Sequence, residues 1–257
     1  MFLLKYKIIN NDKKKYLLFL HCICGNNNIF IKQFPMFSSE YNFILIDLPG
    51  HGESLDYQFP FSFDDVVLDI VSILNKENIE TIDIISLSLG TMIATKLCMY
   101  IPKRINKIVF TGCVFGFSYK LLAFLFSFFI KIKSMVPRRI YMFFITLLIL
   151  PGKQSQERRN SLYRYSLYMQ RNFLYNWLDI MQDFFIDYDL VYSKKLSSSD
   201  ISKIYIAGSQ DCIFSNKVLD SINQNPFNII YILQSSSHLC NYDSETEFNN
   251  IVSHFLS

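Results

Sequence analysis

The segment SLSLG at residues 86–90 separates two patterns of different periodicity. The continuously apolar run Ile82–Leu87 predicts a buried strand, and Met92–Met99 carries apolar residues at helical spacing. A serine at such a junction sits on a sharp strand-to-helix turn, which holds its hydroxyl above the carboxyl edge of the sheet. Small residues two places to either side let the backbone pack closely at this turn. Ser88, flanked by Ser86 and Gly90, is therefore a candidate nucleophile.

Short apolar runs and helical patterns alternate along most of the chain. The runs that predict strands are Phe2–Ile9, Tyr16–Leu20, Tyr41–Leu48, Ile82–Leu87, Ile108–Thr111, Ile204–Ala207 and Ile229–Leu233. The patterns that predict helices are Phe63–Leu74, Met92–Met99, Ser215–Ile222 and Glu245–Phe255. Continuously apolar strands separated by helices indicate an α/β protein with a mostly parallel central sheet and helices on both faces.

The composition excludes several classes of protein. The chain has 257 residues, of which 51% are hydrophobic and 18% are charged. This length predicts one large domain, or a core that carries an insertion. So apolar a chain is not intrinsically disordered, and 8 Gly and 7 Pro are too few for a collagen-like or linker-rich protein. The net charge of +3 is too small to argue for nucleic acid.

The cysteines and the apolar runs bear on the compartment. The six cysteines, spaced unlike a zinc or redox motif, are Cys22, Cys24, Cys98, Cys113, Cys212 and Cys240. Several lie beside apolar strand residues, as buried free thiols do, which favours a reduced, cytoplasmic compartment. The longest apolar runs, Leu121–Ile130 and Ile140–Leu150, are shorter than the roughly 20 residues that span a bilayer. This predicts a soluble protein, with peripheral attachment to a membrane left open.

Residues 114–198 break the alternation and predict a helical cap inserted into a core of residues 1–113 and 199–257. Between Phe115 and Arg171 there are ten basic residues and one acidic residue, Glu157. The basic residues are Lys120, Lys131, Lys133, Arg138, Arg139, Lys153, Arg158, Arg159, Arg164 and Arg171. The rest of the chain has 15 basic and 21 acidic residues, so an acidic core carries a basic, apolar cap.

Four further loops follow predicted strands. HCICG at residues 21–25 and DLPGHGES at residues 47–54 close the first two buried strands. GSQD at residues 208–211 follows a late strand, and Ser237-His238 follows the last one. Farther along, Asp243, Glu247, Phe248 and Asn249 have the spacing expected after a catalytic histidine. Together with SLSLG, these segments resemble the α/β-hydrolase family, in particular its capped carboxylesterase-like and thioesterase-like serine hydrolases.

The resemblance covers the chain outside the cap and departs from the family pattern at two positions. Ser86 replaces the first glycine of G-x-S-x-G, and Cys22 replaces a glycine of the H-G-x-x-G loop. The order Ser, Asp, His along the chain is the one expected for this fold. The resemblance implies a triad of Ser88, Asp211 and His238, and an oxyanion hole formed by the backbone N–H groups of Ile23 and Leu89. It implies neither a cofactor nor a metal.

The histidines themselves lead to the same base. A serine hydroxyl needs a neighbouring base to become a good nucleophile, and the chain has four histidines. His254 lies in a predicted C-terminal helix with no strand end beside it, while His21 and His51 are expected to tie loop backbone together. His238 remains, and it needs a carboxylate to orient it. The strand before the cap ends without an acidic residue, which favours Asp211.

Each candidate also has a structural alternative. Ser88 could be an ordinary helix N-cap, and Asp211 could cap a helix that begins after Cys212. His238 could be a plain loop histidine. Cys22 is expected to pack beside the oxyanion loop, because no basic neighbour lowers its pKa.

The site residues predict a serine hydrolase that cleaves a carboxylic ester or thioester of a hydrophobic, acyl-type substrate through an acyl-enzyme. Two other classes stay open. One is a non-hydrolytic enzyme of the same fold, such as a cyclase, a lyase or an acyltransferase, and the other is a catalytically silent binding protein. Lyases of the menaquinone pathway place an Arg where this chain has Met92, which argues against that subgroup. Dehalogenases and epoxide hydrolases of this fold have Asp where Ser88 stands.

The cap is expected to determine what reaches the site. Its apolar runs, Phe124–Ile130 and Ile140–Leu150, predict a pocket for an acyl chain or another hydrophobic group. Its basic excess predicts an anionic partner, which could be a phospholipid surface, an acidic carrier protein or the substrate itself. Nucleic acid is not expected, because no recognition motif accompanies the charge.

Overall fold

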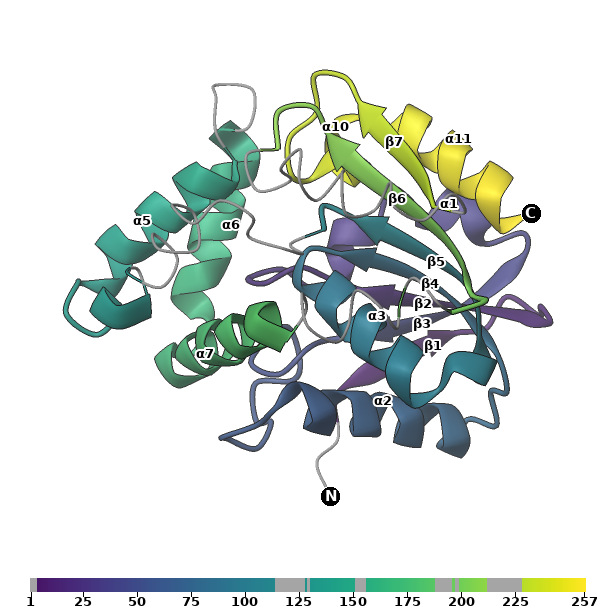
Figure 1. The fold of residues 1–257 in the computed structure, drawn as a ribbon, viewed down its shortest axis with the longest axis horizontal. Coiled ribbons are helices and arrows are strands. Elements are labelled where there is room, and N and C mark those ends of the chain that lie inside the picture. The colour runs from purple at the N-terminus through teal and green to yellow at the C-terminus, as the bar shows by residue number, and fades with distance from the viewer. Residues whose placement is uncertain are drawn as a thin grey trace.

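The computed structural model describes residues 4–113, 128, 130–150, 156–187, 196, 199–211 and 228–257. Within them, seven strands form one sheet in the order β1-β3-β2-β4-β5-β6-β7 (Figure 1). The strands are β1 Tyr6–Ile9, β2 Lys15–Leu20, β3 Tyr41–Ile46, β4 Ile82–Leu87, β5 Ile105–Thr111, β6 Ser202–Gly208 and β7 Ile229–Leu233. Neighbouring strands are parallel except for the edge pair β1 and β3. The predicted mostly parallel α/β sheet is confirmed.

Helices cover the sheet on both faces, with α2 and α3 on one and α1 and α11 on the other (Figure 1). The core helices are α1 Phe34–Phe37, α2 Phe63–Lys76, α3 Leu89–Tyr100, α10 Cys240–Asp243 and α11 Glu245–Leu256, with single 3₁₀ turns at η1 Asn27–Phe30 and η2 Pro102–Arg104. The helix predicted at residues 215–222 lies outside the described residues.

The central strands are apolar on both sides because helices pack against both faces of the sheet. Every residue of β3 and β4 is buried, as expected for strands inside a parallel sheet. The helix α2 begins at a capping box, in which Ser62 and Asp65 each accept a hydrogen bond from the other's backbone N–H. Its buried residues recur at helical spacing, which presents one apolar face to the core.

Three helices between β5 and β6 stand to one side of the sheet (Figure 1). They are α5 Arg138–Ile149, α6 Gln156–Tyr168 and α7 Arg171–Asp187, and we call them the cap helices. They contact loops that follow strands: Trp177 Nε1 donates to the carbonyl of Pro49, after β3, at 2.9 Å, and Arg158 pairs with Asp243, after β7. The cap helices therefore lie at the carboxyl edge of the sheet.

The structure also describes the state of the cysteines and the length of the apolar helices. Within the described part of the chain, Cys22, Cys24, Cys98, Cys113 and Cys240 are all buried and free. No helix among the described residues is both long enough and apolar enough to cross a bilayer.

Candidate active site

Ser88 occupies the turn between β4 and α3 in a conformation that an ordinary helix cap does not have. Its φ is 52° and its ψ is −113°, and its side chain makes no capping hydrogen bond. Its backbone N–H instead donates to the carbonyl of Thr111 at 2.9 Å. A positive φ at a non-glycine residue is uncommon and marks a strained backbone. Ser88 thus stands at the N-cap position of α3, but its side chain does not cap the helix.

The two small residues on either side of Ser88, at positions 86 and 90, are accommodated for different physical reasons. A Cβ at Gly90 would lie 2.1 Å from the carbonyl oxygen of Leu20, so α3 starts directly against the end of β2. Ser86 is fully buried, and its hydroxyl donates to the carbonyl of Val109 at 2.8 Å. A buried hydroxyl is costly unless it is hydrogen-bonded, and this bond explains why serine is accommodated where the family has glycine.

His238 and Asp211 are in direct contact and both are buried. His238 Nδ1 donates to Asp211 Oδ2 at 2.8 Å. The other ring nitrogen, Nε2, is buried without a hydrogen-bond partner among the described residues. A carboxylate on Nδ1 fixes the tautomer in which Nε2 carries a lone pair and can accept a proton. In this tautomer the lone pair of His238 lies on Nε2.

Glycine lets the loops after β6 and β7 approach closely. A Cβ at Gly208 would lie 2.2 Å from the carbonyl oxygen of Ser237. The N–H of Gln210 donates to the carbonyl of Ser236 at 2.8 Å. Asp211 and His238 follow these two contacts directly. Their pairing is thus built into the backbone of both loops.

Ser88 and His238 both contact the end of β5. Ser88 is hydrogen-bonded to Thr111, and the next residue, Gly112, packs against the His238 ring. A Cβ at Gly112 would lie 3.1 Å from His238 Cε1 and 3.2 Å from Nδ1. The structure therefore places Ser88, Asp211 and His238 at the carboxyl edge of β4, β6 and β7, with Asp211 and His238 in direct contact.

The two candidate oxyanion donors lie at the same edge. Leu89 is the first residue of α3, and the first N–H groups of a helix have no partner within the helix. Ile23 lies in the loop after β2, the strand beside β4, and α3 packs against the end of β2 through Gly90. The positive end of the α3 dipole points to the same place. Ile23 and Leu89 therefore both lie beside the end of β2.

The thiols beside these donors are unsuited to nucleophilic attack. Burial raises the pKa of the Cys22 thiol to about 12, and that of Cys24 likewise to about 12. The thiolate is the reactive form of cysteine, so both side chains stay inert near neutral pH. The N–H of Cys24 donates to His51 Nε2 at 2.9 Å, which holds the oxyanion loop against the loop after β3.

His21 and His51 tie loop backbone together, as predicted. His21 Nε2 accepts from the N–H of Leu48 at 3.0 Å, and its Nδ1 donates to the carbonyl of Cys22 at 2.8 Å. His51 Nδ1 donates to the carbonyl of Pro49 at 3.0 Å. Burial is the main cause that lowers the pKa of both imidazoles, so each stays neutral. His254, which was not expected to be the base, is exposed on α11.

Asp47 organises the loop after β3. Its carboxylate accepts from Asn27 Nδ2 at 2.8 Å and from the N–H of Glu53 at 3.0 Å. The hydroxyl of Ser54 donates to its carbonyl at 2.6 Å. A Cβ at Gly52 would lie 2.1 Å from Asp47 Oδ2, so only glycine fits there. Asp47 is consequently a structural residue of the site.

Two contacts from the cap helices reach the site loops and were missed by the sequence analysis. Trp177 of α7 contacts the His51 ring at 6.3 Å between centroids, besides its hydrogen bond to Pro49. Arg158 of α6 pairs with Asp243, which itself binds the N–H of Ser237 at 2.8 Å. A lone tryptophan in an apolar helix was the available signal for the first contact. No local pattern signals the second.

Several basic residues of the cap are engaged within it. Arg138 donates to the carbonyls of Ser166 and Met169 at the end of α6, and burial lowers its pKa. Arg159 donates to the carbonyl of Leu150 at 2.8 Å, and Lys133 pairs with Asp179. Lys120 and Lys153 lie outside the described residues. Part of the basic excess is therefore structural.

The apolar run of residues 140–150 is divided between two environments. Tyr141 and Met142 are buried, while Ile140, Phe143 and Phe144 are exposed. At most half of this run can line the predicted acyl pocket, because a helix points its residues in all directions. The other run, residues 124–130, lies largely outside the described part.

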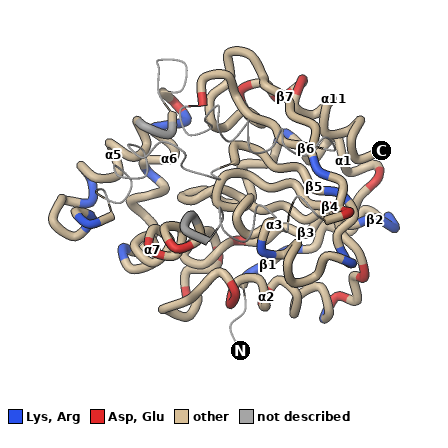
Figure 2. The backbone as a smooth tube through the Cα atoms, viewed as in Figure 1, with Lys and Arg blue, Asp and Glu red and all other residues tan. Residues whose placement is uncertain are grey.

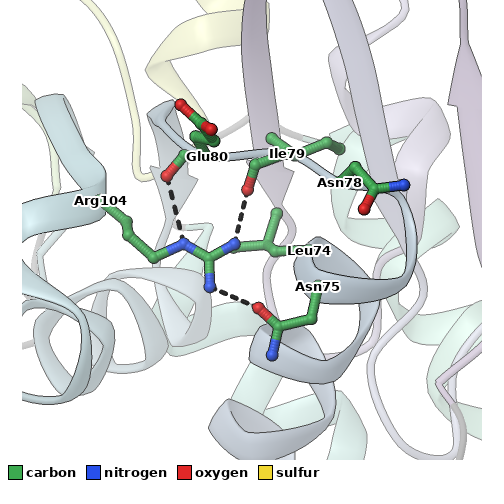
Figure 3. Close-up of a pocket in the computed structure, with 6 residues that line it drawn as sticks. All are labelled: Leu74, Asn75, Asn78, Ile79, Glu80 and Arg104. Carbon is green, nitrogen blue, oxygen red and sulfur yellow. Dashed lines mark hydrogen bonds between the residues drawn. The ribbon is translucent and has the colours of Figure 1, made fainter.

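One hollow of the surface lies at the opposite edge of the sheet (Figure 3). It is lined by residues that precede β4 and β5, namely Leu74, Asn75, Asn78, Ile79, Glu80 and Arg104. The Arg104 guanidinium donates to the side chain of Asn75 and to the carbonyls of Ile79 and Glu80. These bonds tie the end of α2 to the start of β4, so Arg104 has a structural role.

No group of three His, Cys, Asp or Glu side chains in the described ranges is arranged to hold a metal ion. The expectation that the protein uses no metal and no cofactor stays a prediction.

Comparisons with known proteins agree with this architecture. Residues 15–129 match a family model described as the alpha/beta hydrolase fold. The chain is 24% identical over 106 residues to 3-oxoadipate enol-lactonase 2 of Acinetobacter baylyi, covering 41% of this chain and 40% of that protein. It is 32% identical over 103 residues to 2-succinyl-6-hydroxy-2,4-cyclohexadiene-1-carboxylate synthase of Serratia proteamaculans, covering 38% of each. The matches thus span about two fifths of these curated relatives.

The structural likeness extends over the whole chain. A hydrolase from Oleispira antarctica superposes with a TM-score of 0.83 at 16% sequence identity, covering 97% of this chain and 93% of its own. At such low identity the likeness concerns the fold. Seven strands in the observed order, a strained serine after β4 and the matching family model lead to one conclusion. The chain has the α/β-hydrolase fold.

Proposed function

We propose that the protein is a serine hydrolase that cleaves a carboxylic ester or thioester of a hydrophobic, acyl-type substrate. Ser88 is the nucleophile, His238 the general base and then acid, and Asp211 the residue that orients His238. The backbone N–H groups of Ile23 and Leu89 form the oxyanion hole. Residues 1–113 and 199–257 constitute the hydrolase core, and residues 114–198 the cap.

One observation carries this proposal. His238 binds a buried carboxylate through Nδ1 at 2.8 Å and presents a buried Nε2 that no described residue occupies. A histidine with a merely structural role usually has both nitrogens satisfied, as His21 and His51 do here. This contrast within one chain supports the proposal that His238 is the reactive imidazole.

The reaction follows from this arrangement. The Ser88 hydroxyl attacks the substrate carbonyl carbon while its proton passes to His238 Nε2. The carbonyl oxygen becomes an oxyanion that accepts hydrogen bonds from the N–H groups of Ile23 and Leu89. When the carbon–oxygen or carbon–sulfur bond breaks, His238 returns the proton to the leaving alcohol or thiol. Water then attacks the acyl-enzyme by the same steps and releases the acid.

The similarity to the synthase from Serratia proteamaculans gives a second candidate, a lyase. The menaquinone-pathway lyases of this fold place an arginine at the position of Met92. Met92 is fully buried in α3, where a cation would need a partner. The enol-lactonase similarity points instead to an ester, because a lactone is a cyclic ester. We therefore prefer hydrolysis of an ester or thioester.

A fluorophosphonate label combined with p-nitrophenyl esters, from acetate to palmitate, tests the proposal. Ser88→Ala should abolish labelling and lower the rate by about 10⁴ to 10⁶, as loss of a triad serine does. His238→Ala should be about as damaging, and the double variant little worse, because the groups act as a unit. His254→Ala, at an exposed position on α11, is the matched control and should keep full activity.

The outcome that would contradict the proposal is equally clear. If Ser88→Ala is labelled as fast as the wild type, Ser88 is not the nucleophile. If the wild type is neither labelled nor active on any chain length, it is not a serine hydrolase, and the non-hydrolytic enzyme and the binding protein are the classes that are left. A preference for long over short acyl chains would support the acyl-type substrate, since each buried methylene adds about 0.8 kcal/mol at most.

A further inference from the structure

The helix α5 is apolar on two opposite sides. Its inward side is buried and includes Tyr141, Met142 and Thr146. Its outward side is a stripe at positions i, i+3, i+4 and i+7, formed by Ile140 (50% exposed), Phe143 (50%), Phe144 (49%) and Leu147 (39%). We call these four residues the outer stripe. A surface helix normally turns polar or charged residues outward, and a helix that is apolar all round is normally covered.

Single exposed apolar residues are ordinary, but a contiguous stripe of four is not. No acidic residue occurs in α5, and after Arg139 the helix contains no charged residue at all. Met135, one turn before the helix, is 80% exposed and extends the apolar surface at this end. Figure 1 places α5 at the outer side of the cap helices, away from the sheet. The outer stripe therefore lies on the cap helix that is farthest from the sheet, and one of its rings, Phe143, also contacts Tyr163 of α6 with centroids 6.4 Å apart.

The charges near the outer stripe are positive. Lys131 and Arg139 are exposed, and neither makes an ion pair with a residue that the structure describes. Arg138 and Lys133, by contrast, are used inside the cap. Figure 2 shows Lys and Arg gathered at the entry to α5, the end of the cap helices farthest from the sheet. An apolar stripe bordered by free cations complements a surface that is apolar inside and anionic outside.

We propose that the outer stripe of α5 inserts into the surface of an anionic phospholipid bilayer, with Lys131 and Arg139 contacting the headgroup phosphates. An apolar helix face bordered by basic residues is typical of helices that lie in the plane of the membrane interface. With 12 residues, α5 is far too short to span a bilayer. This binding surface does not depend on the proposed hydrolysis.

A protein partner fits the outer stripe less well. Protein interfaces surround their apolar centre with a polar rim, and carry about one hydrogen bond per 100–200 Å². The outward residues of α5 from Ile140 to Leu147 include no hydrogen-bonding side chain. A lipid surface requires no hydrogen bonds from the inserted side chains, because acyl chains make only apolar contacts and anionic headgroups are attracted by positive charge.

Vesicle co-sedimentation of the full-length protein tests the proposal. The probes are vesicles of phosphatidylcholine alone and of equal parts phosphatidylglycerol and phosphatidylcholine. The wild type should bind the anionic vesicles at least about tenfold more tightly than the neutral ones, since each Lys or Arg near an anionic surface adds roughly 1 kcal/mol. Added salt should weaken binding, because it screens exposed charges.

Two variants separate the apolar and the charged contributions. Phe143→Ser with Phe144→Ser should reduce binding to anionic vesicles by about tenfold or more, because the inserted area is lost. Lys131→Glu with Arg139→Glu should lower binding to anionic vesicles and leave binding to neutral ones nearly unchanged. Leu68→Ser, at a comparably exposed leucine on α2 of the core, is the matched control and should bind like the wild type. Far-UV circular dichroism checks that each variant is folded.

Four results would overturn the proposal. The first is failure of the wild type to bind anionic vesicles. The second is equal binding by the wild type and the double serine variant. The third is a dimer in analytical ultracentrifugation that the double serine variant disperses, which would show that a second copy of the chain covers the outer stripe. Binding to an acidic acyl carrier protein without binding to vesicles would overturn it in the same way.

Discussion

Arg158 of α6 pairs with Asp243, with Nη2 2.5 Å from Oδ1, while the other carboxylate oxygen of Asp243 accepts hydrogen bonds from the N–H and hydroxyl of Ser237. Ser237 directly precedes His238. A residue of the cap thus helps to hold the loop that carries the proposed base. Through this one carboxylate, the position of α6 and the geometry of the candidate site are linked.

Replacing Arg158 should therefore affect both stability and activity. Asp243 is mostly buried, so Arg158→Ala leaves a poorly solvated charge and should cost on the order of 1–2 kcal/mol of unfolding free energy. The freed loop should also lower kcat on a p-nitrophenyl ester by several fold. Urea unfolding and steady-state kinetics measure the two effects. Arg164→Ala, at an exposed position of the same helix, is the control and should change neither.

Gly112 should be intolerant of any side chain for reasons specific to the site. Its φ is +55°, and a Cβ there would meet the His238 ring at 3.1–3.2 Å. Gly112→Ala should add backbone strain of about 1–2 kcal/mol and displace His238, so kcat should fall at least about tenfold.

Asn78→Ala provides the matched control for Gly112→Ala. Asn78 has a φ of 53° and lies by the hollow at the opposite edge of the sheet (Figure 3). It should lose comparable stability and retain activity. Equal kinetic losses in the two variants would show that strain, rather than the position of His238, limits the rate.

Most of the core could be predicted from the sequence because its signals are local. Continuous apolar runs identified β2 to β7, and helical spacing identified α2, α3 and α11. The antiparallel pairing of β1 with β3 is a tertiary contact, and no local sequence pattern predicts it. The outward direction of half of α5 could not be predicted for a similar reason. An apolar residue in the sequence does not reveal whether protein or another surface covers it.

In the candidate site, too, local signals could be predicted from the sequence and long-range contacts could not. Ser88, Asp211 and His238 could be proposed because each follows a strand, and parallel strands end at one edge of the sheet. The partner of Asp47 at Asn27 and the pairing of Arg158 with Asp243 join segments that are far apart in sequence. Such contacts depend on loop conformations, which composition and spacing do not specify.

The neutral histidines of the two site loops predict a pH dependence of stability. Burial lowers the folded-state pKa of His51 well below 6.5, whereas in the unfolded chain its pKa is ordinary. Below about pH 6.5 the unfolded state therefore binds more protons, and stability should fall as the pH decreases, by up to about 1.4 kcal/mol per pH unit for each such histidine. His21 acts in the same direction.

Comparison of the wild type with His51→Gln isolates this contribution. Buried Asp69 and Asp83 have raised pKa values and act in the opposite direction at lower pH, but their effect is common to both proteins. Histidine titrates between roughly pH 5 and 7.5. When the free energy of unfolding is measured with urea across this range, its slope against pH should be shallower for the variant. Parallel slopes would mean that His51 is already protonated in the folded state or remains solvated there.

Trp177 gives a spectroscopic report on the junction between the cap helices and the core, because it is the sole tryptophan of the chain. It is fully buried, donates to the carbonyl of Pro49 at 2.9 Å and packs on Phe61 with ring centroids 4.9 Å apart. Folded protein should show blue-shifted emission with little quenching by acrylamide. Phe61→Ala removes one wall of this environment, so quenching should rise and stability should fall by about 3–5 kcal/mol at most. Phe255→Ala on α11, away from the cap helices, should leave the emission unchanged. Emission at the wavelength of free tryptophan in the folded wild type would mean that α7 does not dock on the loop after β3.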